Sequence, residues 1–253
     1  MMRRVRIAWR LGATIPWCGL AALICSLGGL FGRFGLVWKT TTGMVWARGL
    51  ARIFSMRVTV TGTPPSGRFL MVSNHLSYID IIVVLTQVRA FFVGRADLRD
   101  WPLVKWLIRA SGTILIDRSK RSDVRHVNER IAAILQQGGS IALFPEATTS
   151  PGDRVYPFKS SLFDFAARNN LEVRPAAISY RTPPGEDPAH KAVVWFGDDM
   201  PFGKHVLNLA TMPAFEATIT FAANPIADSD RKALAQRLTD VVQSHFIPVV
   251  PPE

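Results

Sequence analysis

Residues 69–87, FLMVSNHLSYIDIIVVLTQ, combine a short apolar run, a polar turn and a second, longer apolar run. Residues 69–73 are typical of a buried β-strand, whereas residues 78–87 suffice for about three turns of helix. A strand that enters a helix through a short turn is the repeating unit of sheets whose strands run parallel. This stretch therefore indicates an α/β fold.

The same alternation continues along the chain after Arg57. Further candidate strands are residues 58–61, 90–94, 113–116, 140–144, 174–179, 192–196 and 215–221. Further candidate helices are residues 102–110, 124–137, 162–169 and 231–246. Short strands separated by helices predict an α/β domain with a mixed, largely parallel sheet flanked by helices.

The first third of the chain has a different composition. Residues 11–32 are uncharged, and the residues that precede Asp80 include ten basic ones and no acidic one. As a helix, residues 11–32 would be about 33 Å long, close to the hydrocarbon thickness of a bilayer. Four of the seven tryptophans (9, 17, 38 and 46) accompany this run, as interfacial anchors do. We expect a membrane-embedded helical segment over residues 1–56 and a separate domain over residues 57–253.

Three arrangements of this N-terminal segment are open. A cleaved signal peptide fits the basic start, but no small-x-small cleavage site follows the apolar run. A single span would leave arginine on both sides of the membrane, which the positive-inside rule does not favour. A kinked or re-entrant pair of helices, with residues 34–54 as the second helix, keeps both basic flanks at one face. We expect the pair of helices.

Composition and missing motifs speak against several classes of protein. Two cysteines, Cys18 and Cys25, are too few for a disulfide scaffold or a cysteine-rich zinc module. The five histidines show no HExxH pattern or close pair, so we expect no metal. Glycine-rich nucleotide loops and a GxSxG elbow are missing. Of the net charge of +11, +10 lies before Asp80 in the first third of the chain, so we expect no nucleic-acid partner.

The turn at residues 74–77 and the start of the helix that follows contain the first candidate catalytic residues. Across a strand-to-helix turn, His75 and Asp80 can meet, and the carboxylate would then fix the tautomer of the imidazole and increase the basicity of its other nitrogen. A general base needs this arrangement. The alternative is that Ser77 and Asp80 form a capping box and that Asp80 only begins the helix.

Two more candidate strands end in polar residues. Arg118 follows residues 113–116, and residues 140–144 precede a carboxylate and three hydroxyls, which belong to Glu146, Thr148, Thr149 and Ser150. In α/β sheets, ligands gather at the carboxyl ends of the strands. Three polar clusters at three such ends indicate a binding site rather than three separate helix caps.

Together these segments resemble the glycerolipid acyltransferase family, whose members acylate lysophosphatidic acid and related lysolipids. Asn74, His75 and Asp80 match its NHxxxxD motif, and FPEATTS at residues 144–150 is similar to its FPEGTTS-type motif. The other similar blocks are residues 92–118, 157–163 and 173–176. The resemblance covers about residues 57–180, and the combination of blocks is highly specific.

The resemblance implies that His75 is the general base and Asp80 its orienting partner. His75 would take the proton of a lysolipid hydroxyl that attacks the thioester of acyl-CoA or acyl carrier protein, with no covalent acyl-enzyme and no cofactor beyond this acyl donor. The acceptor-binding residues that it implies are Asn74, Arg118, Glu146, Ala147, Thr148, Thr149, Ser150 and Lys159.

Ala147 departs from the family pattern, which usually has glycine at this position. Glycine there implies either a positive φ or a close approach of the backbone to a ligand. We expect Ala147 to accept the turn at negative φ, with a methyl group that narrows the acceptor pocket.

The leading expectation is an acyltransferase of the bacterial inner membrane, with its active site on the cytoplasmic face, that converts 1-acylglycerol-3-phosphate to phosphatidic acid. The alternative acceptor is another lysolipid, such as lyso-ornithine lipid, which lacks a phosphate. Outside this chemistry, the chain could be a catalytically silent membrane lipid-binding protein, although such a protein could lose His75 or Asp80 freely. Acyl-chain length, choice of donor and oligomeric state stay open.

Overall fold

The centre of the fold, in a computed structural model that describes residues 2–100, 104–117, 121–197 and 200–250, is a seven-stranded sheet. Its order is β1-β7-β6-β2-β5-β3-β4, and neighbouring strands are parallel except for β6 and β7. The strands are β1 Met56–Thr61, β2 Leu70–Ser73, β3 Phe91–Arg95, β4 Ile114–Ile116, β5 Ile141–Leu143, β6 Val173–Arg181 and β7 Phe215–Phe221. The mixed, largely parallel sheet is confirmed.

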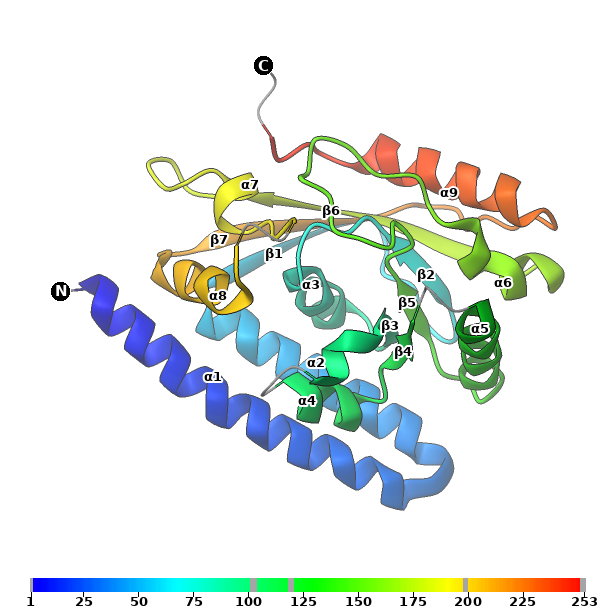
Figure 1. Ribbon diagram of the computed structural model, residues 1–253, viewed down its shortest axis with the longest axis horizontal. Coiled ribbons are helices and arrows are strands. Elements are labelled where there is room, and N and C mark those ends of the chain that lie inside the picture. The colour runs from blue at the N-terminus through cyan, green and yellow to red at the C-terminus, as the bar shows by residue number, and fades with distance from the viewer. Residues whose placement is uncertain (1, 101–103, 118–120, 198–199, 251–253) are drawn as a thin grey trace.

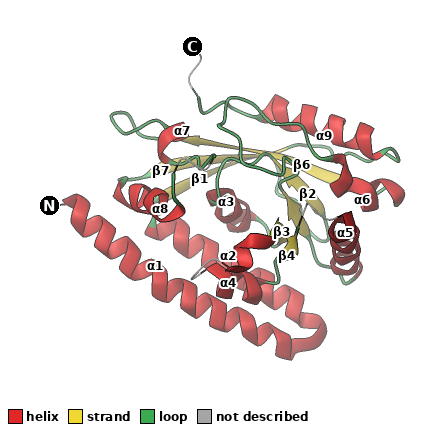
Figure 2. Cartoon of the chain, viewed as in Figure 1, coloured by secondary structure: helices red, strands yellow, loops and turns green. Residues whose placement is uncertain are grey.

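Helices cover both faces of the sheet (Figures 1 and 2). The α-helices are α1 Met2–Ser26, α2 Gly35–Ile53, α3 Ile79–Gln87, α4 Val104–Ser111, α5 Arg121–Gln136, α6 Asp164–Arg168, α7 Ala189–Ala192, α8 Phe202–Thr211 and α9 Arg231–His245. Three 3₁₀ turns, η1 Leu27–Phe34, η2 Ala96–Asp100 and η3 Ser160–Phe163, complete the described elements. Figure 1 shows α9 on one side of the sheet and α3, with α1 and α2 beyond it, on the other.

The strands that carry the predicted site lie in the middle of the sheet. β2 and β5 are adjacent and parallel, and every residue of both strands is buried. Fully buried strands are expected where a parallel sheet is covered on both faces. Their carboxyl ends, at Ser73 and Leu143, therefore emerge side by side from a rigid core.

The strand predicted at residues 192–196 is wrong. α7 ends at Ala192, and the next residues form no strand, although Val193 and Val194 are buried. Their amides bond back to the carbonyl of Ala189, and the amide of Trp195 donates to the carbonyl of Leu76. A short apolar run predicts burial but does not distinguish a strand from another buried segment.

α1 and α2 form an antiparallel hairpin, whose turn η1 contains Gly32 at a φ of +50° (Figure 1). The ring of Trp17 packs directly on Gly49, and its indole nitrogen donates to the carbonyl of Trp46 at 3.0 Å. The second helix, Gly35–Ile53, nearly coincides with the expected residues 34–54. The expected pair of helices is therefore present as a structural unit, and β1 begins three residues after it ends.

The hairpin leaves much of its apolar surface uncovered. Among the described helices, the one at Arg3–Gly32 is long and apolar enough to cross a membrane, with a mean hydropathy of 1.7 in its most apolar window. The exposed apolar residues of the hairpin include Val5, Trp9, Ile15, Leu20, Leu23, Leu27, Leu30, Phe31, Phe34, Val37, Trp38 and Val45. An apolar surface of this extent marks a membrane or protein contact.

Arg10 joins the hairpin to the rest of the fold. Its side chain is only 2% exposed, and its guanidinium group donates to the carbonyl of Ile53, at the end of α2, and to the hydroxyl of Ser55. It also donates to the carbonyls of Met212 and Pro213, just beyond α8. Carbonyls at the C-terminal end of a helix lack helical partners and favour a cation.

We therefore predict that Arg10→Ala lowers the free energy of unfolding by about 2–4 kcal/mol, since it leaves several buried carbonyls without donors. Urea unfolding of the detergent-solubilised protein measures this effect. Arg4→Ala, which removes an exposed arginine of the same helix, is the control and should change stability little. Equal stability of the two variants would contradict a structural role for Arg10.

Candidate active site

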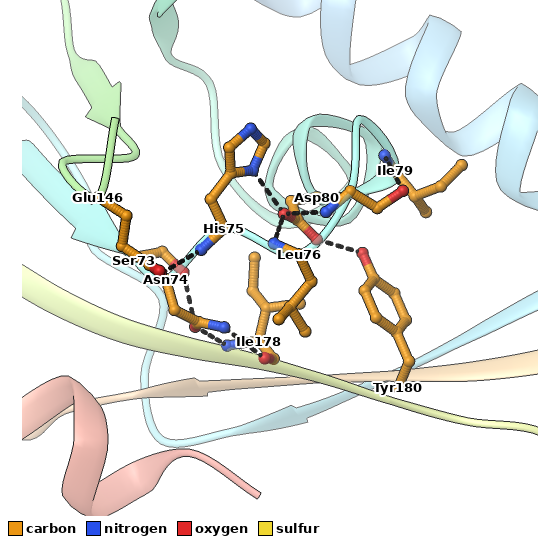
Figure 3. Close-up of polar contacts among 10 residues, drawn as sticks. Ser73, Asn74, His75, Leu76, Ile79, Asp80, Glu146, Ile178 and Tyr180 are labelled. Atoms are coloured by element: carbon orange, nitrogen blue, oxygen red, sulfur yellow. Dashed lines mark hydrogen bonds and ion pairs between the residues drawn. The ribbon is translucent and has the colours of Figure 1, made fainter. Parts of the chain in front are cut away.

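His75 and Asp80 are in direct contact at the carboxyl end of β2 (Figure 3). The Nδ1 atom of His75 lies 2.7 Å from Oδ2 of Asp80. The imidazole side chain is 21% exposed, whereas the carboxylate is fully buried. A carboxylate at Nδ1 favours the tautomer in which this atom carries the proton and Nε2 has a free lone pair. The ring is thus prepared to accept a proton at Nε2, which points away from Asp80 (Figure 3).

Asp80 also organises the turn itself. Its Oδ2 atom accepts the amides of Leu76 at 2.7 Å and Ser77 at 2.9 Å, and its Oδ1 atom accepts the hydroxyl of Tyr180 at 2.5 Å. The bond from the Ser77 amide is one half of the capping box considered as the alternative. Asp80 therefore holds the start of α3 and the imidazole of His75 at the same time.

Asn74 ties the turn to β6. Its side-chain oxygen accepts the amide of Ile178 at 2.7 Å, and its side-chain nitrogen donates to the carbonyl of Ile178 at 2.9 Å. β2 ends at Ser73, so this amide group extends the β2–β6 pairing by one step. Asn74 is fully buried, and both ends of its amide are occupied by the main chain.

The ring of Phe144 holds the imidazole of His75 from one face. The two rings are stacked, with centroids 4.3 Å apart and an angle of 10° between their planes. Phe92 stacks behind Phe144 at 5.8 Å. The sequence predicted neither this stacking nor the bond from Tyr180, and the Phe144 position within the FPEATTS segment was the one available signal.

Glu146 holds the main chain of the turn. Its Oε1 atom accepts the amide of His75 at 2.7 Å, and its Oε2 atom accepts the amide of Tyr156 at 3.1 Å. The side chain is 2% exposed. Burial raises the pKa of Glu146 to about 8; the two amides oppose this shift, and the nearby Asp80 adds to it.

A cavity of about 280 Å³ opens beside this turn. It is lined by Glu146, Ala147, Thr148, Tyr156, Pro157 and Lys159. The structure therefore brings four predicted acceptor residues together in one pocket and adds Tyr156 and Pro157, which the sequence analysis did not select.

The other predicted acceptor residues are placed differently. Ser150 is buried, its amide donates to the carbonyl of His75 at 2.8 Å, and its hydroxyl has no hydrogen-bond partner among the described residues. Thr149 is half-buried. Arg118 lies outside the described residues. Within the part of the chain that the structure describes, no cluster of His, Cys, Asp and Glu side chains could hold a metal ion.

The expectation of a negative φ at Ala147 is wrong. Ala147 has a φ of +72°, in the left-handed region that side chains with a Cβ rarely adopt. The turn after β5 is tight, and the amide of Ala147 donates back to the carbonyl of Phe144 at 3.3 Å. The glycine that the family usually has here is therefore explained by the conformation of the backbone.

Comparison with known proteins agrees with this geometry. A sequence model of the acyltransferase family matches residues 57–179. The lyso-ornithine lipid O-acyltransferase of Brucella abortus (strain 2308) is 30% identical over 220 residues, which cover 82% of this chain and 82% of that protein. The chain belongs to the acyltransferase family.

A relative named for another acceptor and a solved structure are also similar to this acyltransferase. The 1-acyl-sn-glycerol-3-phosphate acyltransferase of Neisseria gonorrhoeae is 26% identical over 182 residues, which cover 71% of this chain and 69% of that protein. The crystal structure of the 1-acyl-sn-glycerophosphate acyltransferase PlsC from Thermotoga maritima superposes with a TM-score of 0.65. The superposition covers 96% of this chain and 95% of the Thermotoga maritima chain. At 22% sequence identity, it shows that the two share a fold.

The positive φ of Ala147 predicts that Ala147→Gly stabilises this acyltransferase by up to about 1 kcal/mol, because glycine adopts this conformation without steric strain. Ala233→Gly, at an exposed position in α9, is the matched control and should destabilise by about 0.5–1 kcal/mol. Thermal unfolding of both variants measures the difference. Destabilisation by both would contradict the strained conformation.

The raised pKa of Glu146 predicts a pH dependence of stability. The folded acyltransferase binds this proton up to about pH 8, whereas the unfolded chain releases it near the ordinary value of 4.5, so the stabilisation is lost as the pH rises between these values. The melting temperature of the wild type should therefore fall relative to that of Glu146→Gln from pH 5 to pH 9. Glu186→Gln, on an exposed loop, should follow the wild type. A difference between wild type and Glu146→Gln that does not vary with pH would contradict the raised pKa.

Proposed function

We propose that this acyltransferase transfers a fatty acyl group from an acyl thioester to the hydroxyl of a lysolipid, with His75 as the general base. The observation that carries the proposal is the 2.7 Å contact between His75 and Asp80 beside a pocket lined by the FPEATTS segment. The donors considered are acyl-CoA and acyl carrier protein, both of which present the same thioester.

The contacts around His75 support a direct transfer. Nε2 of His75 takes the proton of the acceptor hydroxyl, and the oxygen of this hydroxyl attacks the thioester carbonyl carbon. The carbon–sulfur bond then breaks, and the thiolate leaves with the proton from the imidazolium. Asp80 stabilises the imidazolium that forms between these steps. General-base assistance of this kind contributes about 10²- to 10⁴-fold to the rate.

We infer that lyso-ornithine lipid is the preferred acceptor. The Brucella abortus relative, which is 30% identical, is named a lyso-ornithine lipid O-acyltransferase. The Neisseria gonorrhoeae relative, which is named for 1-acyl-sn-glycerol-3-phosphate, is 26% identical. The comparisons therefore favour the alternative acceptor over the leading expectation from the sequence. The ornithine headgroup offers a carboxylate with one negative charge, whereas a phosphate monoester carries about −1.5 to −2 at neutral pH.

The pocket offers side chains that fit an ornithine headgroup. Among the described residues that line it, Lys159 carries the positive charge, and the hydroxyls of Thr148 and Tyr156 can accept from the ammonium group of an ornithine. Lys159 is therefore assigned to the acceptor carboxylate.

The N-terminal hairpin supports a location of the protein at a membrane. Its exposed apolar surface and its basic residues fit attachment to an anionic membrane leaflet, where both lysolipid and product reside. We propose residues 1–56 as the membrane anchor and residues 57–253 as the catalytic domain, at the cytoplasmic face of a bacterial inner membrane.

The acceptor is tested with purified protein in detergent micelles, given lyso-ornithine lipid or 1-acylglycerol-3-phosphate and palmitoyl-CoA or palmitoyl acyl carrier protein. We expect kcat/KM for lyso-ornithine lipid to exceed that for 1-acylglycerol-3-phosphate at least about tenfold, equivalent to 1.4 kcal/mol of transition-state binding. The masses of the products identify the transfer. A preference for 1-acylglycerol-3-phosphate would overturn the acceptor assignment, and no transfer to either lipid would overturn the proposed reaction.

The general base is tested by His75→Ala, which should lower kcat by about 10²- to 10⁴-fold, because the acceptor hydroxyl then has no group to take its proton. Flotation with vesicles should show unchanged membrane association. His126→Ala, which removes an exposed histidine of α5, is the control and should keep full activity. Turnover by His75→Ala at the wild-type rate would show that another group acts as the base.

A further inference from the structure

Tyr180 contacts the oxygen of Asp80 that faces away from His75 (Figure 3). Its hydroxyl donates to Oδ1 of Asp80 at 2.5 Å, whereas the imidazole of His75 approaches Oδ2. Tyr180 lies on β6, two residues after Ile178, whose main chain binds the amide of Asn74. One strand therefore holds both ends of the turn that carries His75.

The two oxygens of Asp80 are bound unequally. Oδ2 accepts three N–H donors, from His75, Leu76 and Ser77. Among the described residues, the partner of Oδ1 is Tyr180. Because Asp80 is fully buried, solvent does not reach Oδ1 to replace this donor.

The hydroxyl of Tyr180 is suited to remain a hydrogen-bond donor at every working pH. Its side chain is buried, and burial together with the adjacent Asp80 raises the pKa of Tyr180 well above its ordinary value. The hydroxyl therefore keeps its proton throughout the working pH range. Tyr180 does not line the acceptor pocket, so a role in binding the lysolipid does not explain its position.

We propose that Tyr180 is a positioning residue for the general base: its hydroxyl orients the Asp80 carboxylate and sets the pH range in which His75 is free to accept a proton. This inference rests on the proposed function of His75. It assigns a part in the reaction to Tyr180, which lies on β6 beyond the similar block at residues 173–176.

The direction of the effect follows from the charge of the pair. With a proton on the imidazole, His75 and Asp80 together are neutral; without it, the pair carries one negative charge. A hydroxyl donor stabilises the pair more strongly in the negative state. Removing this donor makes the pair hold its proton to higher pH, whichever of the two residues carries it.

The other titratable groups around Asp80 do not replace Tyr180. Glu146, beyond the end of β5, has a pKa raised to about 8 by burial, and its oxygens face main-chain amides. Tyr78 also has a pKa raised by burial, and its hydroxyl pairs with Nδ1 of His205 at 3.0 Å. The contacts of both residues are made without the Tyr180 hydroxyl.

Tyr180→Phe tests the proposal because it removes the hydroxyl and keeps the ring. We expect the acidic limb of the pH–rate profile to move to higher pH by about 0.5–1 unit, with kcat at the original midpoint reduced about two- to fivefold and the acceptor KM within about twofold of wild type. Tyr78→Phe is the matched control, since it removes a partly buried tyrosine hydroxyl that contacts a histidine outside the site. Its acidic limb should stay at the wild-type pH.

A second variant separates this role from a loss of folding. Site-specific replacement of Tyr180 by 3-fluorotyrosine keeps the volume and makes the hydroxyl a stronger donor, so the acidic limb should move in the opposite direction, to lower pH. A purely structural role predicts no such reversal. An acidic limb that stays in place in both Tyr180 variants overturns the proposal.

The rate at which diethylpyrocarbonate modifies His75, followed by peptide mass at each pH, gives a readout that needs no lysolipid. The midpoint of this modification should move up in Tyr180→Phe and stay in place in Tyr78→Phe. An unshifted midpoint overturns the role of Tyr180. A wild type that acylates no lysolipid overturns instead the proposed function, even where the His75 midpoint shifts.

Discussion

A carboxylate without access to water needs hydrogen-bond donors around it. The geometry of this site depends on the donors that surround the buried carboxylate of Asp80. Its donors come from the turn that it caps, from the imidazole of His75 and from Tyr180 on β6. An unpaired charge at this depth would be strongly unfavourable. The same bonds that offset the burial of Asp80 therefore also hold the imidazole in the orientation that a general base needs.

The turn is rigid because its main chain is fully paired. Each amide and carbonyl of residues 75–77 has a partner, supplied by Asp80, Glu146, Ser150 and Trp195. These partners come from α3, from the segment after β5 and from the segment after α7. In the proposed reaction, a base held in this way needs little rearrangement when the acceptor binds, and positioning of this kind contributes to the rate. The pocket shares Glu146 with the turn, so in the proposed reaction one structural unit places both the lysolipid and the base.

The guanidinium group of Arg10 is one of the contacts between the hairpin and the rest of the fold. Arg10 joins the carbonyls at the end of α2 to those just beyond α8, so the apolar hairpin keeps one orientation relative to the sheet. The proposed acceptor and product are both membrane lipids, and acylation of such lipids would benefit from a fixed arrangement of this kind.

Local sequence patterns predicted much of the fold and part of the site. Strand and helix periodicity, turn residues and the spacing of His75 and Asp80 all depend on residues that are close together along the chain. These patterns predicted the sheet class, the pair of N-terminal helices and the strand ends that meet at the site. The apolar run at residues 192–196 and the backbone of Ala147 were misjudged, since burial and φ both depend on what packs around them. Tyr180, one hundred residues after Asp80, was found only in the tertiary structure. Its place beside Asp80 follows from the sheet order, in which β6 pairs with β2, and a pairing between distant strands leaves no periodic signal in either of them.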